Sequence, residues 1–227
     1  MENREKKKKS ERPFFLKPGL LTQELKTPER LWMVVLLLNR YGATPTIEEF
    51  SKISDLSLGF ISKFANILRQ AGFLAEGQRL KILNPRSLLD IIRDAYFFEG
   101  NHLIPYYSDK TPEQLIEKMA TLKKPYALTR MCGAALIAPF VRYQYFDFYI
   151  PDNNDLPYWK KTLDLVDVEA VGNVNIVIPQ NGRILNQTQT VKGCRIVNNI
   201  QLYLDLYKYP ARGREQAEFL REQVIKI

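Results

Sequence analysis

The sequence predicts an α+β protein with an N-terminal winged helix-turn-helix followed by a mixed α/β C-terminal domain. Three amphipathic helices and a short hairpin come first, in the order of a winged helix. Beyond about residue 126, alternating strand patterns are mixed with helices. The 227 residues, 45% of them apolar, suffice for two modest cores or one large one. We therefore expect a basic, flexible arm (1–25), the winged helix (26–98), a connector with a helix (99–125) and the mixed domain (126–227).

Capping residues and hydrophobic periodicity predict four helices in the first half. Thr46 and Glu49 have the spacing of a capping box, Thr27 and Ser57 are N-cap candidates, and Gly72 can end the third helix. We expect these helices at 28–41, 47–53, 57–70 and 87–98, with one apolar stripe on the first (Leu31, Val34, Val35, Leu38) and two short strands joined at Gly77.

The pattern changes in the second half. Residues 101–110 show no clear periodicity and are expected to be irregular, whereas Thr111 opens a helix and Thr129 caps another. Alternation of apolar and polar residues predicts strands. We expect helices at 111–124, 130–137, 197–207 and 211–227, and strands at 145–150, 166–171, 173–178, 182–185 and 188–191.

The net charge of +8, from 33 Lys and Arg against 25 Asp and Glu, leans toward the N-terminal half. Part of this excess is the run Lys6–Lys9 with Arg4 and Arg12. Such a run is usually a solvated arm, but it can also follow phosphates and speed association with a polyanion. Positive charge by itself is weak evidence for a nucleic-acid partner, and the shape of the helical segment has to supply stronger evidence.

The third helix has the pattern of a recognition helix. Ile61, Phe64, Ala65 and Leu68 form its inward face, which leaves a polar face free to enter a major groove about 12 Å wide. Lys and Arg suit guanine edges and phosphates, Asn suits adenine, and small residues allow close approach. The predicted DNA contacts are Ser57, Gly59, Ser62, Lys63, Asn66 and Arg69 on this helix, Gln78, Arg79 and Lys81 at the hairpin, and Arg40 and Lys52 as phosphate contacts. A winged helix that docks a protein, without reading DNA, is the alternative.

The sequence offers little for catalysis. One histidine (His102) and two cysteines (Cys132 and Cys194) argue against a metal site, a disulfide framework or a His-based triad, and no phosphate-binding or nucleophile-elbow motif is present. Asp167 and Glu169 would share one face of a strand, as in a metal-dependent nuclease, but no lysine follows at the matching spacing. We expect no enzyme activity, no cofactor and no metal, and keep the nuclease as a further alternative.

No apolar run approaches the roughly 20 residues of a membrane-spanning helix, and the charged N-terminus has no secretory pattern. The expected protein is therefore cytoplasmic, without a membrane partner.

Three stretches of the chain share one pattern of order and spacing. They are 68–96, beginning Leu-Arg-Gln-Ala-Gly-Phe-Leu, 126–143, beginning Tyr-Ala-Leu-Thr-Arg-Met, and 200–220, beginning Ile-Gln-Leu-Tyr-Leu-Asp. Together they resemble one family, the AbiEi-type antitoxins of type IV toxin–antitoxin systems, which are also described as transcriptional regulators. The likeness covers most of the chain after about residue 25, and the third stretch is the most specific. One departure is Arg130, where members of the family usually have glycine.

The resemblance implies a repressor that binds double-stranded DNA at repeated operator sites in its own promoter. It also implies a C-terminal domain that counters a nucleotidyltransferase-like toxin in an abortive-infection (phage defence) system, without a stable complex. The family assigns no catalytic residue to this chain.

Overall fold

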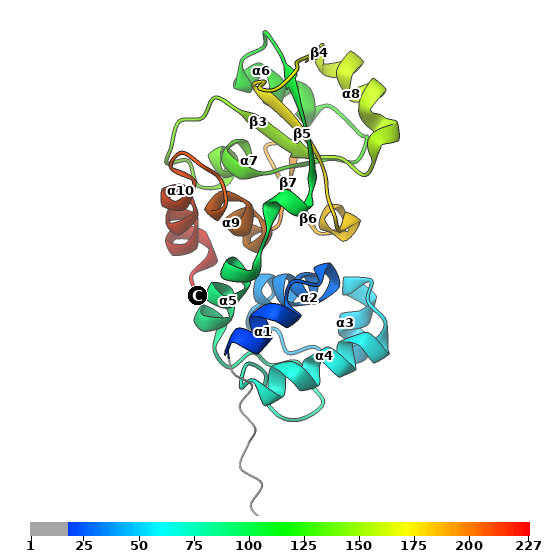
Figure 1. The fold of residues 1–227 in the computed structure, drawn as a ribbon, viewed down its shortest axis with the longest axis vertical. Helices are drawn as coiled ribbons and strands as arrows, with labels where there is room; N and C mark the ends of the chain where they lie inside the picture. The colour runs from blue at the N-terminus through cyan, green and yellow to red at the C-terminus, as the bar shows by residue number, and fades with distance from the viewer. Residues whose placement is uncertain (1–17) are drawn as a thin grey trace, which may run out of the picture.

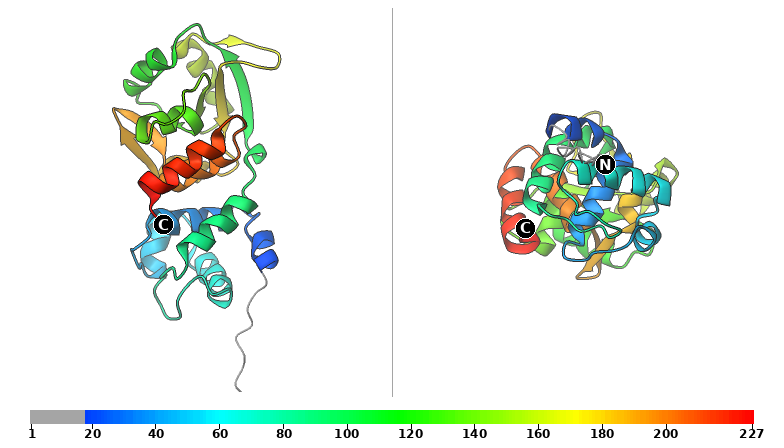
Figure 2. Two further views of the ribbon diagram at one scale, coloured as in Figure 1. Left: turned by 90° about the vertical axis from the view of Figure 1, so that its left-hand side faces the viewer. Right: turned by 90° about the horizontal axis from the view of Figure 1, so that it is seen from below.

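The computed structural model describes residues 18–227, which form an α+β fold with a helical half and a sheet half (Figure 1). The lysine-rich run 6–9 of the expected arm lies outside the described residues. Helices α1–α5 gather at one end of the elongated molecule and the strands at the other, with α9 and α10 between them (Figures 1 and 2). None of the described helices is long and apolar enough to cross a membrane.

The helical half begins earlier than expected. Residues 18–25 were predicted to belong to the flexible arm, but α1 occupies Pro18–Glu24, and Leu21 and Leu25 are fully buried. These two leucines account for the difference, because burying them against the rest of the half stabilises the helix. The next three helices start directly after the predicted N-cap residues: α2 (Pro28–Asn39), α3 (Ile47–Ser54) and α4 (Leu58–Gln70). The fourth, α5 (Pro85–Ala95), starts and ends earlier than the predicted 87–98, because the Asn84 side chain caps it by accepting from the backbone N–H of Ser87.

Two of the expected caps are present as hydrogen bonds. Thr46 and Glu49 form the capping box of α3, and the Ser57 hydroxyl accepts from the backbone N–H of Phe60 at 3.3 Å. Thr27 lies at the N-cap of α2, but its side chain makes no capping bond.

The loop between α4 and α5 folds back on itself, with less regular pairing than two predicted strands. Single bridges join Leu74 to Ile82 and Thr46 to Arg79, and the backbone N–H of Leu80 donates to Pro45 at 2.8 Å. The paired segments contain only a few residues each and are too short to form regular strands. Gly77 adopts a positive φ of 111° at the tip, as a tight turn requires.

The sheet half contains a mixed seven-stranded sheet in the order β4-β1-β5-β3-β2-β7-β6. Strands β3 and β5 pair in parallel, as do β2 and β7, and the other neighbours are antiparallel. The strands are β1 (His102–Tyr107), β2 (Ala127–Leu128), β3 (Phe146–Tyr149), β4 (Val166–Asp167), β5 (Val174–Ile178), β6 (Thr188–Val191) and β7 (Cys194–Val197).

Several strand predictions were wrong. Residues 101–110 were expected to be irregular, but β1 pairs with β5 over five residues despite Pro105 in its interior, a residue that weakens a strand prediction. Residues 182–185 form part of the 3₁₀-helix η3 (Gly182–Asn186), and the strand expected at 166–171 ends at Asp167. Strands β2 and β7 were missed altogether.

Helices flank the sheet and fill the space between it and the helical half. They are α6 (Pro112–Ala120), α7 (Arg130–Ile137), α8 (Leu156–Leu163), α9 (Asn199–Tyr207) and α10 (Gly213–Leu220). Helix α10 continues as a π-helical turn (Arg221–Ile225), and short 3₁₀ turns occupy Phe98–Gly100 and Asn153–Asp155. Gly213 opens α10 where a Cβ would lie 2.3 Å from the carbonyl oxygen of Leu206, so only glycine fits.

The helix α2 is buried on every side, not along one stripe. All residues from Trp32 to Leu38 are at most 3% exposed, because α9 of the sheet half packs against the helix opposite the other helices of its own half. The buried apolar side chains form one continuous core that runs through both halves.

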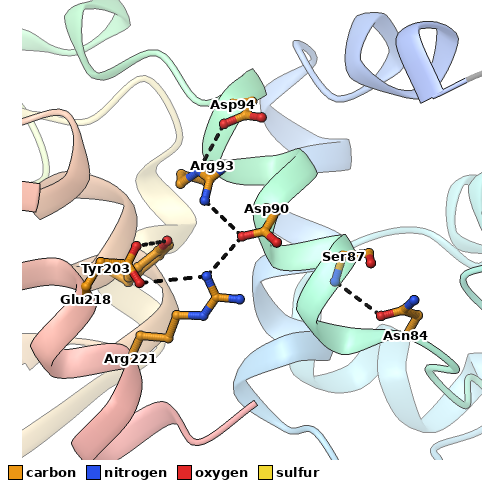
Figure 3. Close-up of polar contacts among 8 residues, drawn as sticks. All are labelled: Asn84, Ser87, Asp90, Arg93, Asp94, Tyr203, Glu218 and Arg221. Carbon is orange, nitrogen blue, oxygen red and sulfur yellow. Dashed lines mark hydrogen bonds and ion pairs between the residues drawn. The ribbon is translucent and has the colours of Figure 1, made fainter.

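Polar contacts also join the two halves. Asp90 on α5 accepts from Arg93 at 2.9 Å and from Arg221 of the C-terminal turn at 3.0 Å (Figure 3). Arg221 also lies 3.8 Å from Glu218, which accepts from the Tyr203 hydroxyl at 3.0 Å (Figure 3). The last turn of the chain is therefore tied to α5 as well as to its own helix.

A second junction is a buried carboxylate, Asp205 on α9. It accepts hydrogen bonds from the hydroxyls of Tyr96, Thr129 and Tyr149 and from the amide of Gln201. Thr129 was expected to cap α7, but its hydroxyl is directed to Asp205 and makes no capping bond. Burial raises the pKa of Asp205 above its ordinary value, and these hydrogen bonds counteract part of that shift.

Arg130, at the position where the family resemblance expects glycine, has a left-handed backbone with a φ of 49°. Its buried guanidinium lies 3.6 Å from the centre of the Phe98 ring and 3.7 Å from Asp147. Burial raises the pKa of Asp147, while Arg130 and the amide of Asn175 act in the opposite direction. The backbone geometry thus suits glycine, and the arginine side chain is held by two rings, those of Phe98 and Tyr209, and by one carboxylate.

Candidate nucleic-acid interface

The outer surface of α4 lies at the end of the molecule farthest from the sheet (Figure 1). The predicted inward residues Ile61, Phe64, Ala65 and Leu68 are all buried, which confirms the predicted orientation of the helix. The opposite side carries Gly59, Lys63, Asn66 and Gln70 at i, i+4, i+7 and i+11, all exposed, and we call these four residues the α4 face.

The α4 face carries one cation and two amides close together. Lys63 makes no hydrogen bond or ion pair with any residue between 18 and 227, so its ammonium is available to a ligand. Asn66 is exposed and accepts one hydrogen bond through its side-chain oxygen. Ser62, predicted as a contact, lies beside this row and is half-buried.

The N-terminal end of α4 is open to solvent. Ser57 is exposed while its hydroxyl caps the helix, and a Cβ added at Gly59 would meet nothing within 4 Å. The backbone N–H groups of the first turn and the positive end of the helix dipole are therefore accessible to an anion. The close approach expected at Gly59 is sterically possible from outside.

Arg69 lies on the same helix but is engaged within the protein. Its guanidinium donates to the carbonyl oxygens of Ala75 at 3.2 Å and Gly77 at 2.8 Å and to the side-chain oxygen of Asn66 at 2.8 Å. The predicted base or phosphate contact is thus a brace between α4 and the following loop. Because its donors point at these acceptors, Arg69 also fixes the orientation of the Asn66 amide.

The loop residues Gln78, Arg79 and Lys81 are all exposed. Arg79 donates to the carbonyl oxygen of Thr44 at 2.7 Å and lies 4.0 Å from Glu49, so part of its charge is used to hold the loop against α3. Gln78 and Lys81 make no side-chain hydrogen bond with the residues that the structure describes. Lys81 is therefore the loop cation that remains available.

The two predicted phosphate contacts outside these elements differ. Arg40 is exposed, but its guanidinium donates to the side-chain oxygen of Gln187 in the sheet half at 3.3 Å. Lys52 is exposed on α3 without an ion pair in the described part of the chain. Of the two, Lys52 is the cation without a partner among residues 18–227.

The structure adds residues that the sequence interpretation missed. Gln70 and the 48% exposed Leu58 lie on the accessible side of α4, and the helical spacing from Lys63 and Asn66 could have identified Gln70. Arg183 and Gln187 of the sheet half donate to the carbonyl oxygens of Asp55 and Ile53 at 3.0 and 3.1 Å. These two contacts hold the turn from α3 to α4, and nothing in the local sequence indicates them.

The acidic pair considered for a nuclease is not arranged as one. Because β4 ends at Asp167, strand alternation does not extend to Glu169, and Asp167 pairs with Lys160 at 2.6 Å. Within residues 18–227, no group of three His, Cys, Asp or Glu side chains could hold a metal ion. Cys132 is buried and hydrogen-bonded to the carbonyl oxygens of Thr129 and Asp147, and burial raises the pKa of its thiol.

Comparisons with known proteins identify no relative: no family model matches the chain, and neither curated proteins nor solved structures give a significant match. The geometry of this chain and the resemblance of its three sequence stretches are therefore the observations that indicate a function.

Proposed function

We propose that residues 26–98 form a winged helix-turn-helix that binds double-stranded DNA sequence-specifically, with α4 as the recognition helix and the 71–84 loop as the wing. The observation that carries the proposal is the α4 face, which presents an unpaired lysine and an oriented asparagine from a helix whose other side is buried. Lysine suits guanine or phosphate, and asparagine can pair bidentately with adenine.

The neighbouring groups fit the same role. The open N-terminus of α4 can accept a phosphate, and Lys81 and Lys52 are exposed cations on the wing and on α3. Gly59 allows the duplex to approach the helix backbone. Phosphate contacts would position the protein, while Lys63 and Asn66 read the bases.

We propose further that the protein is a cytoplasmic antitoxin and autorepressor of the AbiEi type. The support is the resemblance of the three sequence stretches, which meet in the structure where Tyr96 of the first and Thr129 of the second donate to Asp205 of the third. The stretch 200–220 forms α9 and α10, and the stretch 126–143 contains α7, which packs against both helices. The functional partner would be a nucleotidyltransferase-like toxin, countered without a stable complex.

DNA selection from short duplexes of randomised sequence tests the first proposal. We expect an enriched sequence, and Lys63→Ala and Asn66→Ala should reduce affinity for it more than affinity for random duplex. Removing the hydrogen bonds to one base is expected to cost about 1–3 kcal/mol of discrimination. Lys161→Ala, an exposed lysine on α8 in the sheet half, is the matched control and should leave both affinities unchanged.

The salt dependence of DNA affinity distinguishes the role of the wing from that of the recognition helix. Lys81→Ala should weaken binding to all duplexes and reduce the slope of log K against log salt by about 0.9. If no sequence is enriched and the variants at Lys63 and Lys81 bind random duplex as the Lys161 variant does, the domain does not read DNA. A protein partner that the wild type captures in a pull-down and Lys63→Ala does not would then favour the protein-docking alternative.

The antitoxin proposal needs its own test. Co-expression with a nucleotidyltransferase-like toxin encoded beside the gene should restore growth, and the purified proteins should not co-elute. Failure to restore growth by a folded, DNA-binding protein would remove the antitoxin role and leave the regulator.

A further inference from the structure

Between the two halves lies a cavity of about 550 Å³, and none of its lining residues belongs to α4. One wall comes from α2 and from the end of α5 with the residues that follow it, and the other from α9 and the segment between β5 and η3. The volume falls within the 300–1,000 Å³ of typical small-molecule sites, and such sites occur preferentially at junctions between structural units. The cavity is independent of the surface proposed to bind DNA.

The floor of the cavity is apolar and includes an aromatic ring. The half-buried Leu31 of α2 and the 66% exposed Phe97 offer it accessible apolar surface, whereas Trp32 and Val35 line it with only 2% and 0% of their surface exposed. The indole N–H of Trp32 is already donated to the carbonyl oxygen of Ser54 at 3.1 Å, so the ring offers the cavity only its hydrocarbon surface. A ligand body that fills this part must be apolar.

Two cations, one buried amide and the more exposed amides of Asn101, Gln180 and Asn181 supply polarity. Lys26 and Lys208 line the cavity, and neither makes an ion pair with the residues from 18 to 227. The one acidic group in the wall, Asp94, is paired with Arg93 at 2.9 Å. The charge that remains unbalanced is therefore positive, which selects an anion.

The buried amide is that of Gln201, a residue only 2% exposed. Its nitrogen donates to the Tyr96 hydroxyl at 3.2 Å and to Asp205 at 2.9 Å, while its oxygen accepts no hydrogen bond from the described residues. An oxygen held in this way at the wall of a cavity can receive a donor from a ligand.

We propose that this cavity binds a small organic acid with a flat or branched apolar body. The body would lie on Leu31 and the exposed ring of Phe97, the acid group beside Lys26 and Lys208, and a hydroxyl or N–H of the ligand would reach the Gln201 oxygen. Because the walls belong to both halves, the bound molecule stabilises their packing.

The test uses the full-length protein and 8-anilinonaphthalene-1-sulfonate, an aromatic anion that fluoresces in apolar surroundings. We expect saturable binding at one site and a melting temperature that rises with the probe concentration, as ligand binding to the folded state requires. N-phenyl-1-naphthylamine, which lacks the sulfonate, serves as the neutral probe.

Two variants test separately how the cavity binds the apolar body and the acid group of the ligand. Leu31→Trp fills the cavity from a half-buried position and should weaken the binding of both probes at least about tenfold. Lys208→Glu reverses one charge and should weaken the sulfonate about tenfold while leaving the neutral probe bound. Lys161→Glu, an exposed charge reversal outside the cavity, is the matched control.

The proposal is overturned if the sulfonate does not saturate at one site or does not raise the melting temperature. It is also overturned if Lys208→Glu behaves as Lys161→Glu, a comparison that holds even where Leu31→Trp does not fold. Loss of DNA binding in any variant has no bearing on these readouts, so failure of the proposed regulator function is distinguishable.

Discussion

Replacing Arg69 tests whether α4 and the following loop are braced as the structure indicates. The guanidinium makes three hydrogen bonds, to Ala75, Gly77 and Asn66, at 3.2, 2.8 and 2.8 Å. A hydrogen bond of this partly exposed kind contributes about 0.5–1.5 kcal/mol net. Arg69→Met should therefore lower the free energy of unfolding by about 2 kcal/mol, which corresponds to about 4–8 °C in melting temperature for a chain of this size.

Arg69→Lys is the informative partner of that variant. Lysine keeps the charge but cannot present donors to three separate acceptors, so we expect a stability between those of the wild type and the methionine variant. Affinity for random duplex should stay unchanged, because the charge is kept. Affinity for a selected sequence should fall, since Asn66 loses the group that orients it.

Urea unfolding and fluorescence anisotropy with the two kinds of duplex measure these effects. A direct phosphate contact would give a different pattern, in which Arg69→Lys retains both the stability and the sequence discrimination of the wild type. That pattern would refute the brace and restore Arg69 to the DNA contacts.

Three further perturbations have defined outcomes. Gly59→Ala should raise the free energy of unfolding by about 0.5–1 kcal/mol, because a Cβ there meets nothing and alanine favours the helix. The same variant should bind DNA more weakly than the wild type. Equal affinity for DNA would contradict a close approach of the duplex to Gly59. Tyr96→Phe removes one donor to the buried Asp205 and should cost about 1–3 kcal/mol in urea unfolding, whereas Tyr41→Phe at an exposed position should cost nothing measurable. Burial raises the folded-state pKa of Asp147, so the folded protein binds the carboxyl proton more tightly than the unfolded chain does. The stability of the wild type relative to Asp147→Asn should therefore increase as the pH falls from 7 toward 4. A stability difference that does not change with pH contradicts this.

The helical half could be predicted closely because its signals are local. Capping residues and the 3.6-residue period fix where α3 and α4 begin and which side of α4 is buried, and the structure confirms both. The exposure of Lys63 and Asn66 follows from the same period. The role of Arg69 could not be predicted, because it depends on carbonyl oxygens that the loop brings near only after folding.

The sheet half was harder because its strands are short and contribute few residues to any pattern. Strand β2 has two residues, too few for alternation, and β1 contains Pro105, which argues against a strand. The contacts of Arg183 and Gln187 with the turn after α3 join residues 128 and 134 positions apart. No local pattern encodes contacts at that separation.

The seven consecutive buried residues of α2 determine whether the helical half can be produced as a separate fragment. A fragment that stops before β1 would leave one side of that helix facing water, with Val35 and its neighbours stripped of α9. Such a fragment is expected to aggregate or to bind a substitute surface, so the helical half and the sheet half have to be produced as one chain.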